Sequence, residues 1–276
     1  MAVVAGNLRK MSARLERPVV YQLPVGAAMV ELNPHIGREL AIRHTGRINC
    51  IACGREIKKT FQQGYCFPCV RSLAACDSCQ VKPELCHYAA GTCREPEWGL
   101  AHCMQDHYVY LANTSGLKVG ITRFSQVPTR WIDQGARQAL PMYSVKSRLQ
   151  SGLVEVVLKE QVSDRTDWRR MLQGDPEPVD LPAAALRLHE QCAGEIKILQ
   201  EQLGGSAITL LTDRQPVDII YPVERYPEKV RTYNLDKKPN ISDLLLGIKG
   251  QYLIFAGGVL NVRKYAGYFV EVGPAD

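Results

Sequence analysis

Nine of the ten cysteines in this chain fall between Cys50 and Cys103, and the first four are spaced Cys50-x2-Cys53-x12-Cys66-x2-Cys69. Two Cys-x2-Cys turns can direct four thiolates at one Zn²⁺, and the residues between them suffice for a hairpin that brings the pairs together. We therefore expect a zinc ribbon. Disulfides are the alternative, but the chain begins MAVVAGNLRK without the apolar stretch of a secretory signal, so we expect a cytoplasmic, reducing setting.

A second and less regular group of candidate metal ligands follows the first four cysteines. Its members are Cys76, Cys79, Cys86, Cys93, Cys103 and His107. Because one ion needs only four ligands, the spacing alone leaves the ligand set open. We expect structural zinc here as well, because the neighbouring quartet is zinc-like. An iron–sulfur cluster remains open, since irregular cysteine spacing suits it too.

The positive charge of the chain is concentrated in two stretches. Residues 1–72 contain 11 Lys and Arg against 4 Asp and Glu, and residues 105–170 contain 10 against 6. Such an excess indicates a polyanionic partner, so we expect DNA or RNA to bind, with ordinary solvated charge as the alternative. The candidate contacts are Arg55, Lys58, Lys59 and Arg123. No apolar run approaches the ~20 residues of a membrane span, so no membrane association is expected.

The predicted fold class is α+β, with four successive parts. Residues 1–47 form a β-rich segment, residues 48–104 a cysteine-rich metal-binding module, residues 105–173 a central domain, and residues 174–276 a helix followed by β-strands. The helix is expected over residues 183–203, with an apolar stripe of leucine and isoleucine. We expect the strands of the last part to pair with those of residues 18–49.

The central domain has the predicted element order β-β-α-β-α. Strands over 108–112 and 117–122 flank the turn Asn113-Thr114-Ser115-Gly116, a helix begins near Pro128, a third strand covers 142–145, and a second helix covers 153–162. This order and its residues resemble the GIY-YIG endonuclease superfamily. Tyr108-Val109-Tyr110 resembles the first motif of that superfamily, Lys118-Val119-Gly120 the second, Arg130 the helix arginine, and Glu155 the metal-binding glutamate.

Two positions depart from the best-known members. Lys118 stands where the second motif usually has tyrosine, as in a phage and bacterial branch of the superfamily, and Tyr108 stands where the first motif has glycine. The chain as a whole resembles an uncharacterised bacterial family of unknown function. The stretches that carry this resemblance are 86–87, 91–94 and 130–136.

The GIY-YIG resemblance implies Mg²⁺- or Mn²⁺-dependent hydrolysis of phosphodiesters in DNA or RNA. It implies catalytic roles for Tyr110, Lys118, Arg130 and Glu155. Glu155 would hold the metal, Arg130 would offset transition-state charge, and Tyr110 would position or deprotonate water with its pKa lowered by Lys118 and Arg123. Two alternatives stay open: a zinc-containing protein that binds nucleic acid without cutting it, and a structural or protein-interaction role.

Overall fold

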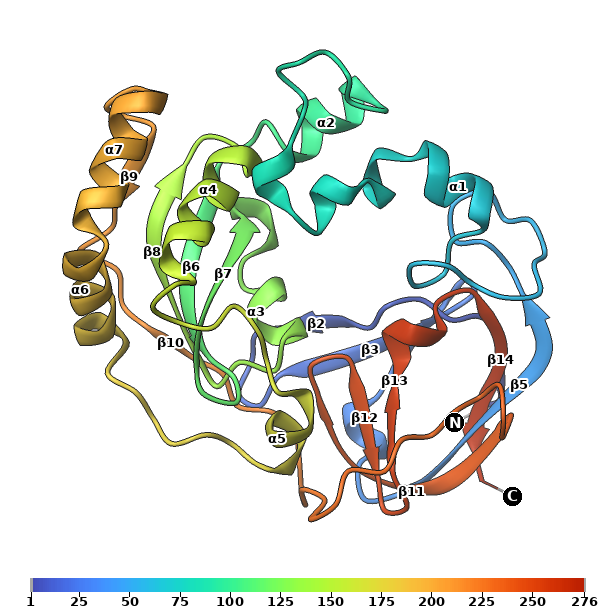
Figure 1. Ribbon diagram of the computed structural model, residues 1–276. Helices are drawn as coiled ribbons and strands as arrows, with labels where there is room; N and C mark the ends of the chain where they lie inside the picture. Colours follow the sequence, from blue (N-terminus) through green and yellow to red (C-terminus); the bar gives the residue numbers. More distant parts are fainter. Residues whose placement is uncertain (1, 276) are drawn as a thin grey trace. The chain divides into compact units, whose positions relative to one another are not determined.

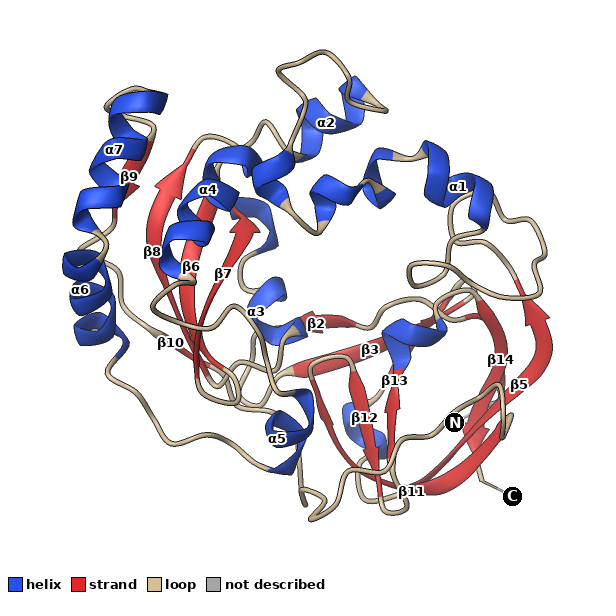
Figure 2. Cartoon of the chain, viewed as in Figure 1, coloured by secondary structure: helices blue, strands red, loops and turns tan. Residues whose placement is uncertain are grey.

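The computed structural model describes residues 2–275 and divides the chain into two compact units (Figure 1). Unit 1 contains residues 1–71, 172–174 and 219–276, and unit 2 contains residues 72–171 and 175–218. Both units contain β-sheet, and helices are concentrated in unit 2 (Figure 2). The expected α+β class is therefore confirmed. Within residues 2–275, no helix has both the length and the apolar character that crossing a bilayer requires.

Unit 1 is built on a six-stranded antiparallel sheet in the order β1-β14-β5-β11-β12-β13. Its strands are β1 (Val4–Asn7), β5 (Glu39–Ile48), β11 (Asn240–Lys249), β12 (Tyr252–Phe255), β13 (Val259–Asn261) and β14 (Tyr268–Pro274). Strand β5 pairs with β14 along one edge and with β11 along the other. Of the strands expected within residues 18–49, only β5 pairs with C-terminal strands as predicted, whereas the earlier ones lie in a separate sheet.

The other strands of unit 1 form a second, three-stranded sheet. It consists of β2 (Ser12–Arg14), β3 (Val20–Val25) and β4 (Ala28–Glu31). Burial alternates along β3, with Tyr21, Leu23 and Val25 facing inward, which is the period of two expected for a strand with one buried face. The short helix α1 (Phe67–Ser72) contains Cys69, the last of the first group of cysteines.

Unit 2 is built on a five-stranded antiparallel sheet. Its strands are β6 (His107–Asn113), β7 (Leu117–Arg123), β8 (Gln138–Val145), β9 (Ile208–Leu210) and β10 (Val217–Asp218). Strand β6 lies between β7 and β8 and is buried along its whole length. The predicted element order appears as β6, β7, α3 (Thr129–Asp133), β8 and α4 (Arg148–Leu158).

Four further helices belong wholly or mainly to unit 2: α2 (Pro96–His102), α5 (Trp168–Gln173), α6 (Leu181–Gln191) and α7 (Ala193–Leu203). Apolar side chains of α4, α6 and α7 share one core with Val109, Leu111 and Val119 of the sheet. Short 3₁₀ helices cover Asn33–His35, Ala74–Cys76, Ser78–Gln80, Pro83–Leu85, Phe124–Gln126 and Val262–Tyr265.

Two helix predictions differ from the structure. The single helix expected over 183–203 is two helices, which meet at Cys192 because the backbone there (φ −107°, ψ 8°) leaves the helical region. Helix α4 begins five residues before the predicted 153, because the Ser147 hydroxyl caps it by accepting from the backbone N–H of Gln150 at 3.3 Å.

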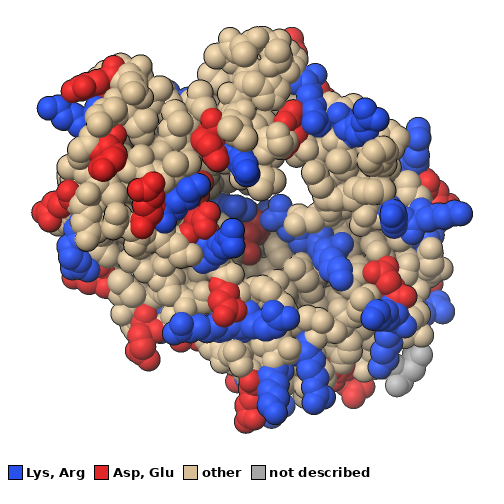
Figure 3. All heavy atoms as spheres, viewed as in Figure 1, with Lys and Arg blue, Asp and Glu red and all other residues tan. Residues whose placement is uncertain are grey.

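On the face shown in Figure 3, Lys and Arg side chains are interspersed with Asp and Glu. Opposite charges close together shorten the reach of a positive field. The charge pattern of this face therefore gives only weak support to the expected polyanionic partner.

The position of α4 is set by an unusually close contact within unit 2, with the 3₁₀ helix η4 (Pro83–Leu85). A Cβ added at Gly152 would lie 2.5 Å from the backbone nitrogen of Glu84 and 2.7 Å from the carbonyl carbon of Pro83. No real Cβ approaches backbone atoms this closely, so only glycine lets η4 pack on α4 in this way.

We predict that Gly152→Ala lowers the free energy of unfolding by about 1–3 kcal/mol, because overpacking outweighs the ~1 kcal/mol that alanine gains over glycine in a helix. Gly194→Ala is the matched control, since Gly194 lies in α7 with no described atom within 4 Å of its added Cβ. This control should gain up to ~1 kcal/mol. Urea unfolding measures both. Equal effects of the two substitutions would contradict the close contact at Gly152.

Candidate functional site

The first four cysteines form a candidate metal-binding group in unit 1. The sulfur atoms of Cys50, Cys53, Cys66 and Cys69 all lie within 4.8 Å of one another, and Cys53 Sγ lies 3.8 Å from Cys66 Sγ. Zn–S bonds of ~2.3 Å in a tetrahedron separate the sulfurs by about 3.8 Å. The backbone N–H of Cys66 donates to Cys50 Sγ at 3.2 Å, a contact that favours thiolate. The four residues can hold a metal ion such as zinc.

The second cysteine pair of this group, Cys66 and Cys69, does not lie on the strand that the expected zinc ribbon would have there. Cys66 immediately precedes α1 and Cys69 lies within it, so the pair sits at the start of a helix and not on a returning strand. Isolated bridges between Asn49 and Glu56 and between Phe61 and Tyr65 hold the intervening loop. The candidate nucleic-acid contacts Arg55, Lys58 and Lys59 are exposed on this loop.

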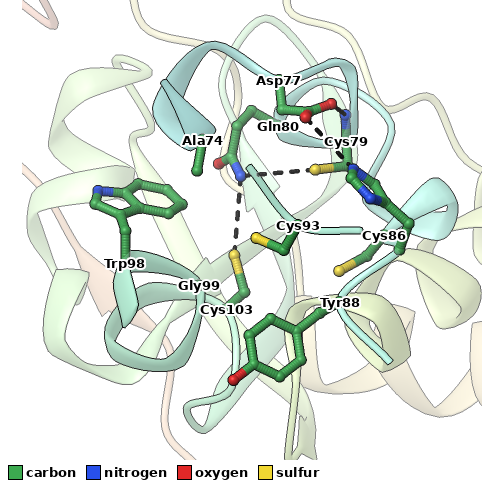
Figure 4. A pocket seen from close by; sticks show the side chains of 11 residues that line it. Ala74, Asp77, Cys79, Gln80, Cys86, Tyr88, Cys93, Trp98, Gly99 and Cys103 are labelled. Atoms are coloured by element: carbon green, nitrogen blue, oxygen red, sulfur yellow. Dashed lines mark hydrogen bonds and ion pairs between the residues drawn. The ribbon is translucent and has the colours of Figure 1, made fainter. Parts of the chain in front are cut away.

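The later cysteines lie in unit 2, where four of them line one pocket: Cys79, Cys86, Cys93 and Cys103 (Figure 4). The other two candidate ligands, Cys76 and His107, are not among the lining residues. His107 Nδ1 lies 2.7 Å from the carbonyl oxygen of Gln105, and burial lowers the pKa of His107 to about 4. A further group of ligand atoms within 4.8 Å of one another comes from Asp77, Cys79 and His87.

The residues of the two central motifs meet on the β6–β7 hairpin. Tyr110 is fully buried and pairs in register with Gly120. A Cβ at Gly120 would lie 2.7 Å from the Tyr110 hydroxyl oxygen, so the tyrosine side chain needs a glycine opposite it. Lys118 lies on the same face of the sheet as Gly120, because side chains two apart on a strand point the same way.

A hydrogen-bonded chain connects Tyr110 to Arg130 of α3. The Tyr110 hydroxyl lies 2.8 Å from the side-chain amide of Gln134. We assign this amide with its nitrogen toward Tyr110, because its oxygen then accepts from Nε and Nη2 of Arg130, both at 3.1 Å. In this orientation Gln134 donates to the tyrosine and accepts from the guanidinium group of Arg130.

Charged groups of β7 and α4 interact with the hydrogen-bonded residues Tyr110 and Arg130. Burial, with a smaller effect of Arg130, lowers the pKa of Lys118 to about 8 against the opposing effects of Glu155 and Asp164. Burial raises the pKa of Glu155, and the neighbouring Asp164 carboxylate acts in the same direction. Lys118, Arg130 and Arg148 partly offset that rise. The structure thus brings Tyr110, Lys118, Arg130 and Glu155 into one electrostatically coupled group.

The expected effect of cations on Tyr110 is wrong. Burial raises the pKa of Tyr110, and the opposing effect of Arg130 does not overcome it. Arg123 is not among the groups that act on Tyr110; it acts on His107, which it faces in the β6–β7 register. The phenol therefore stays protonated at neutral pH, which suits a hydrogen-bonding role and not that of a base.

Sequence reasoning missed three members of this group: Gln134, Arg148 and Asp164. Gln134 is four residues after Arg130, a spacing that places two side chains on the same face of a helix. Arg148 is seven residues before Glu155 on α4, again on one face. No pattern in the sequence around Asp164 marks it as a member of this group. Its neighbour Ser163 accepts a backbone hydrogen bond from Val119 at 2.8 Å, which brings the loop alongside β7.

Comparison with known proteins gives one family. No curated protein and no solved structure matches this sequence. A family model described as a protein of unknown function, DUF2797, matches residues 37–270, which include all of β5 to β13 and both cysteine groups. On this match over most of its length, the chain belongs to the DUF2797 family of proteins of unknown function.

Proposed function

We propose that unit 2 is a metal-dependent phosphodiester hydrolase of the GIY-YIG type that acts on DNA or RNA. The observation that carries the proposal is the grouping of Tyr110, Lys118, Arg130 and Glu155, which come from β6, β7, α3 and α4. These four positions are the ones that the sequence motifs single out. Charged groups with strongly perturbed pKa values that gather in one place are typical of catalytic sites.

The proposed metal ligand is Glu155, with Asp164 as a neighbouring carboxylate. Two carboxylates that interact unfavourably are a suitable environment for a hard divalent cation, because the cation offsets the repulsion between them. Bound Mg²⁺ or Mn²⁺ would supply Lewis-acid polarisation of a scissile phosphate. Without such an ion, the buried Glu155 carboxylate is left with only partial compensation from nearby cations.

Lys118 is the proposed general base in place of the tyrosine of other GIY-YIG proteins. A lysine pKa of about 8 means that a substantial fraction of the side chain is a neutral amine at slightly alkaline pH. Enzymes that use lysine to abstract a proton usually lower its pKa into this range by burying the side chain. The neutral amine of Lys118 accepts the proton of the attacking water.

Tyr110 and Gln134 are positioning residues, because they act through Arg130. The fully buried phenol fixes the Gln134 amide, and the amide oxygen accepts from two nitrogens of Arg130. This leaves the remaining donors of the half-buried guanidinium for phosphate oxygens, and its planar fork suits the charge that develops on them.

A second candidate function is nucleic-acid binding without cleavage. The exposed Arg55, Lys58 and Lys59 favour it, because clustered exposed cations bind phosphate independently of any catalytic group. A structural or protein-interaction role requires neither binding nor cleavage. Binding that survives loss of Glu155, in a protein that never cleaves, would support the second function over the first.

We predict that the protein cleaves DNA or RNA with Mn²⁺ and that Glu155→Gln lowers the rate by about 10²-fold or more, as removal of a key electrostatic group does. Glu160→Gln is the matched control, since Glu160 is an exposed carboxylate just after α4. Gel assays on single- and double-stranded substrates measure cleavage. Failure to cleave any of them, or equal rates for the Glu155 and Glu160 variants, would count against the hydrolase.

The cleavage rate should rise with pH, with an inflection near pH 8 and a plateau above it, because the base must lose its proton and the pKa of Lys118 is lowered to about 8, chiefly by burial. The arginine of Lys118→Arg stays protonated and cannot act as a base. The cleavage rate of this variant should fall by about 10²–10⁴-fold, and the inflection should disappear. Lys146→Arg, at an exposed lysine paired with Asp106 at 3.2 Å, should keep both. An unchanged inflection in Lys118→Arg would exclude Lys118 as the base.

A further inference from the structure

We propose that Cys79, Cys86, Cys93 and Cys103 hold a second metal centre, distinct from the group of Cys50, Cys53, Cys66 and Cys69. The four residues line one pocket of unit 2 (Figure 4). In the described residues the four sulfurs do not all lie within 4.8 Å of one another, unlike those of the first group, so a bound metal would draw them closer together. Four cysteine sulfurs around one pocket are the donor set of a closed thiolate site.

A buried cation supports thiolates at this position. The Arg148 side chain interacts electrostatically with Cys79 and Cys103, and its Nη2 donates to the carbonyl oxygen of Gln80 at 2.7 Å. Its Nε is buried with no hydrogen-bond partner in the described part of the chain. Burying a guanidinium group against neutral thiols is costly, whereas metal-bound thiolates carry the negative charge that offsets it.

Gln80 supplies donors to the same sulfurs. Its Nε2 lies 4.0 Å from Cys79 Sγ and 3.8 Å from Cys103 Sγ, and Figure 4 draws both contacts. Amide N–H groups directed at cysteine sulfur are the usual outer contacts of thiolate metal sites. The pocket therefore offers four candidate thiolate ligands, a cation and an amide donor, with the sulfurs still to be drawn together by the metal.

Asp77, Cys79 and His87 are the competing ligand set, but two of them are already engaged. The Asp77 carboxylate accepts from Arg94 Nε at 2.8 Å and lies 3.4 Å from His87 Nε2. The other ring nitrogen of His87 lies 2.7 Å from the Thr92 hydroxyl. These groups satisfy one another at the edge of the pocket, so we assign them a supporting role.

The second centre also fixes α4. Arg148 is the first residue of α4, and its backbone N–H donates to the carbonyl oxygen of Cys103 at 2.8 Å. Gly152, one turn later, packs on η4, which lies between Cys79 and Cys86 in the chain. A metal bound by these cysteines therefore holds the segment against which α4 rests.

Counting metal in the full-length protein tests the second centre. Wild type should contain two centres, and the double variant C86S/C93S should contain only the first. Cys66→Ser should lose the first and keep the second. Elemental analysis and acid-labile sulfide, on protein purified with and without oxygen, identify the occupant as zinc or an iron–sulfur cluster, since cysteine thiolates hold both.

His87→Ala separates the two ligand sets, because it removes one ligand of the competing set and none of the proposed four. It should keep both centres. Loss of the second centre in His87→Ala, or full metal content in C86S/C93S, would overturn the assignment. If C86S/C93S does not fold, the number of four-thiolate centres can be measured by replacing the metal of the wild-type protein with Co²⁺. Its thiolate-to-cobalt absorption should match two four-thiolate sites, and the intensity of a single site would overturn the proposal.

Discussion

Lys118 is buried and Arg130 and Glu155 are half-buried beside the β6–β7 hairpin, and the proposed site depends on this withdrawal of charge from water. Burial works against the charged forms of both Lys118 and Glu155. Their mutual attraction returns only part of that cost. Natural proteins retain such unfavourable groups mainly where function requires them, which is why this cluster carries the proposed function.

Helix α4 connects the two parts of unit 2 that contain chemically active groups. Its first residue, Arg148, contacts the cysteine pocket, and Glu155 two turns later belongs to the charged cluster. Gly152 lies between them and permits backbone contact with η4. Four thiolates in a closed site leave no open coordination position, so a metal there serves structure. The metal proposed for hydrolysis is a separate ion at Glu155.

Local patterns in the sequence predicted the elements that depend on local physics. The β6–β7 hairpin and the β-β-α-β-α order follow from strand composition, turn residues and helical apolar spacing, and the grouping of Cys50 to Cys69 follows from ligand spacing. The start of α4 was missed because the Ser147 cap is a single short-range contact preceding the apolar spacing. The break at Cys192 was missed because Gly194, a poor helix former two residues later, was not weighed against the apolar stripe. Asp164 joins the cluster only through the long-range contact of its loop with β7.

Melting temperatures with and without Mn²⁺ test the functional origin of the charged cluster most directly. The folded-state pKa of Glu155 lies above its unfolded value, so at pH 8 the ionised carboxylate lowers stability. Glu155→Gln should therefore melt at or above the wild-type temperature without Mn²⁺. Saturating Mn²⁺ should raise the melting temperature of the wild type by several degrees, because a ligand that binds only the folded state stabilises it. The melting temperature of Glu155→Gln should stay unchanged. A variant that melts below wild type, with Mn²⁺ shifting neither protein, would contradict a metal-binding catalytic role and assign these charges to structure.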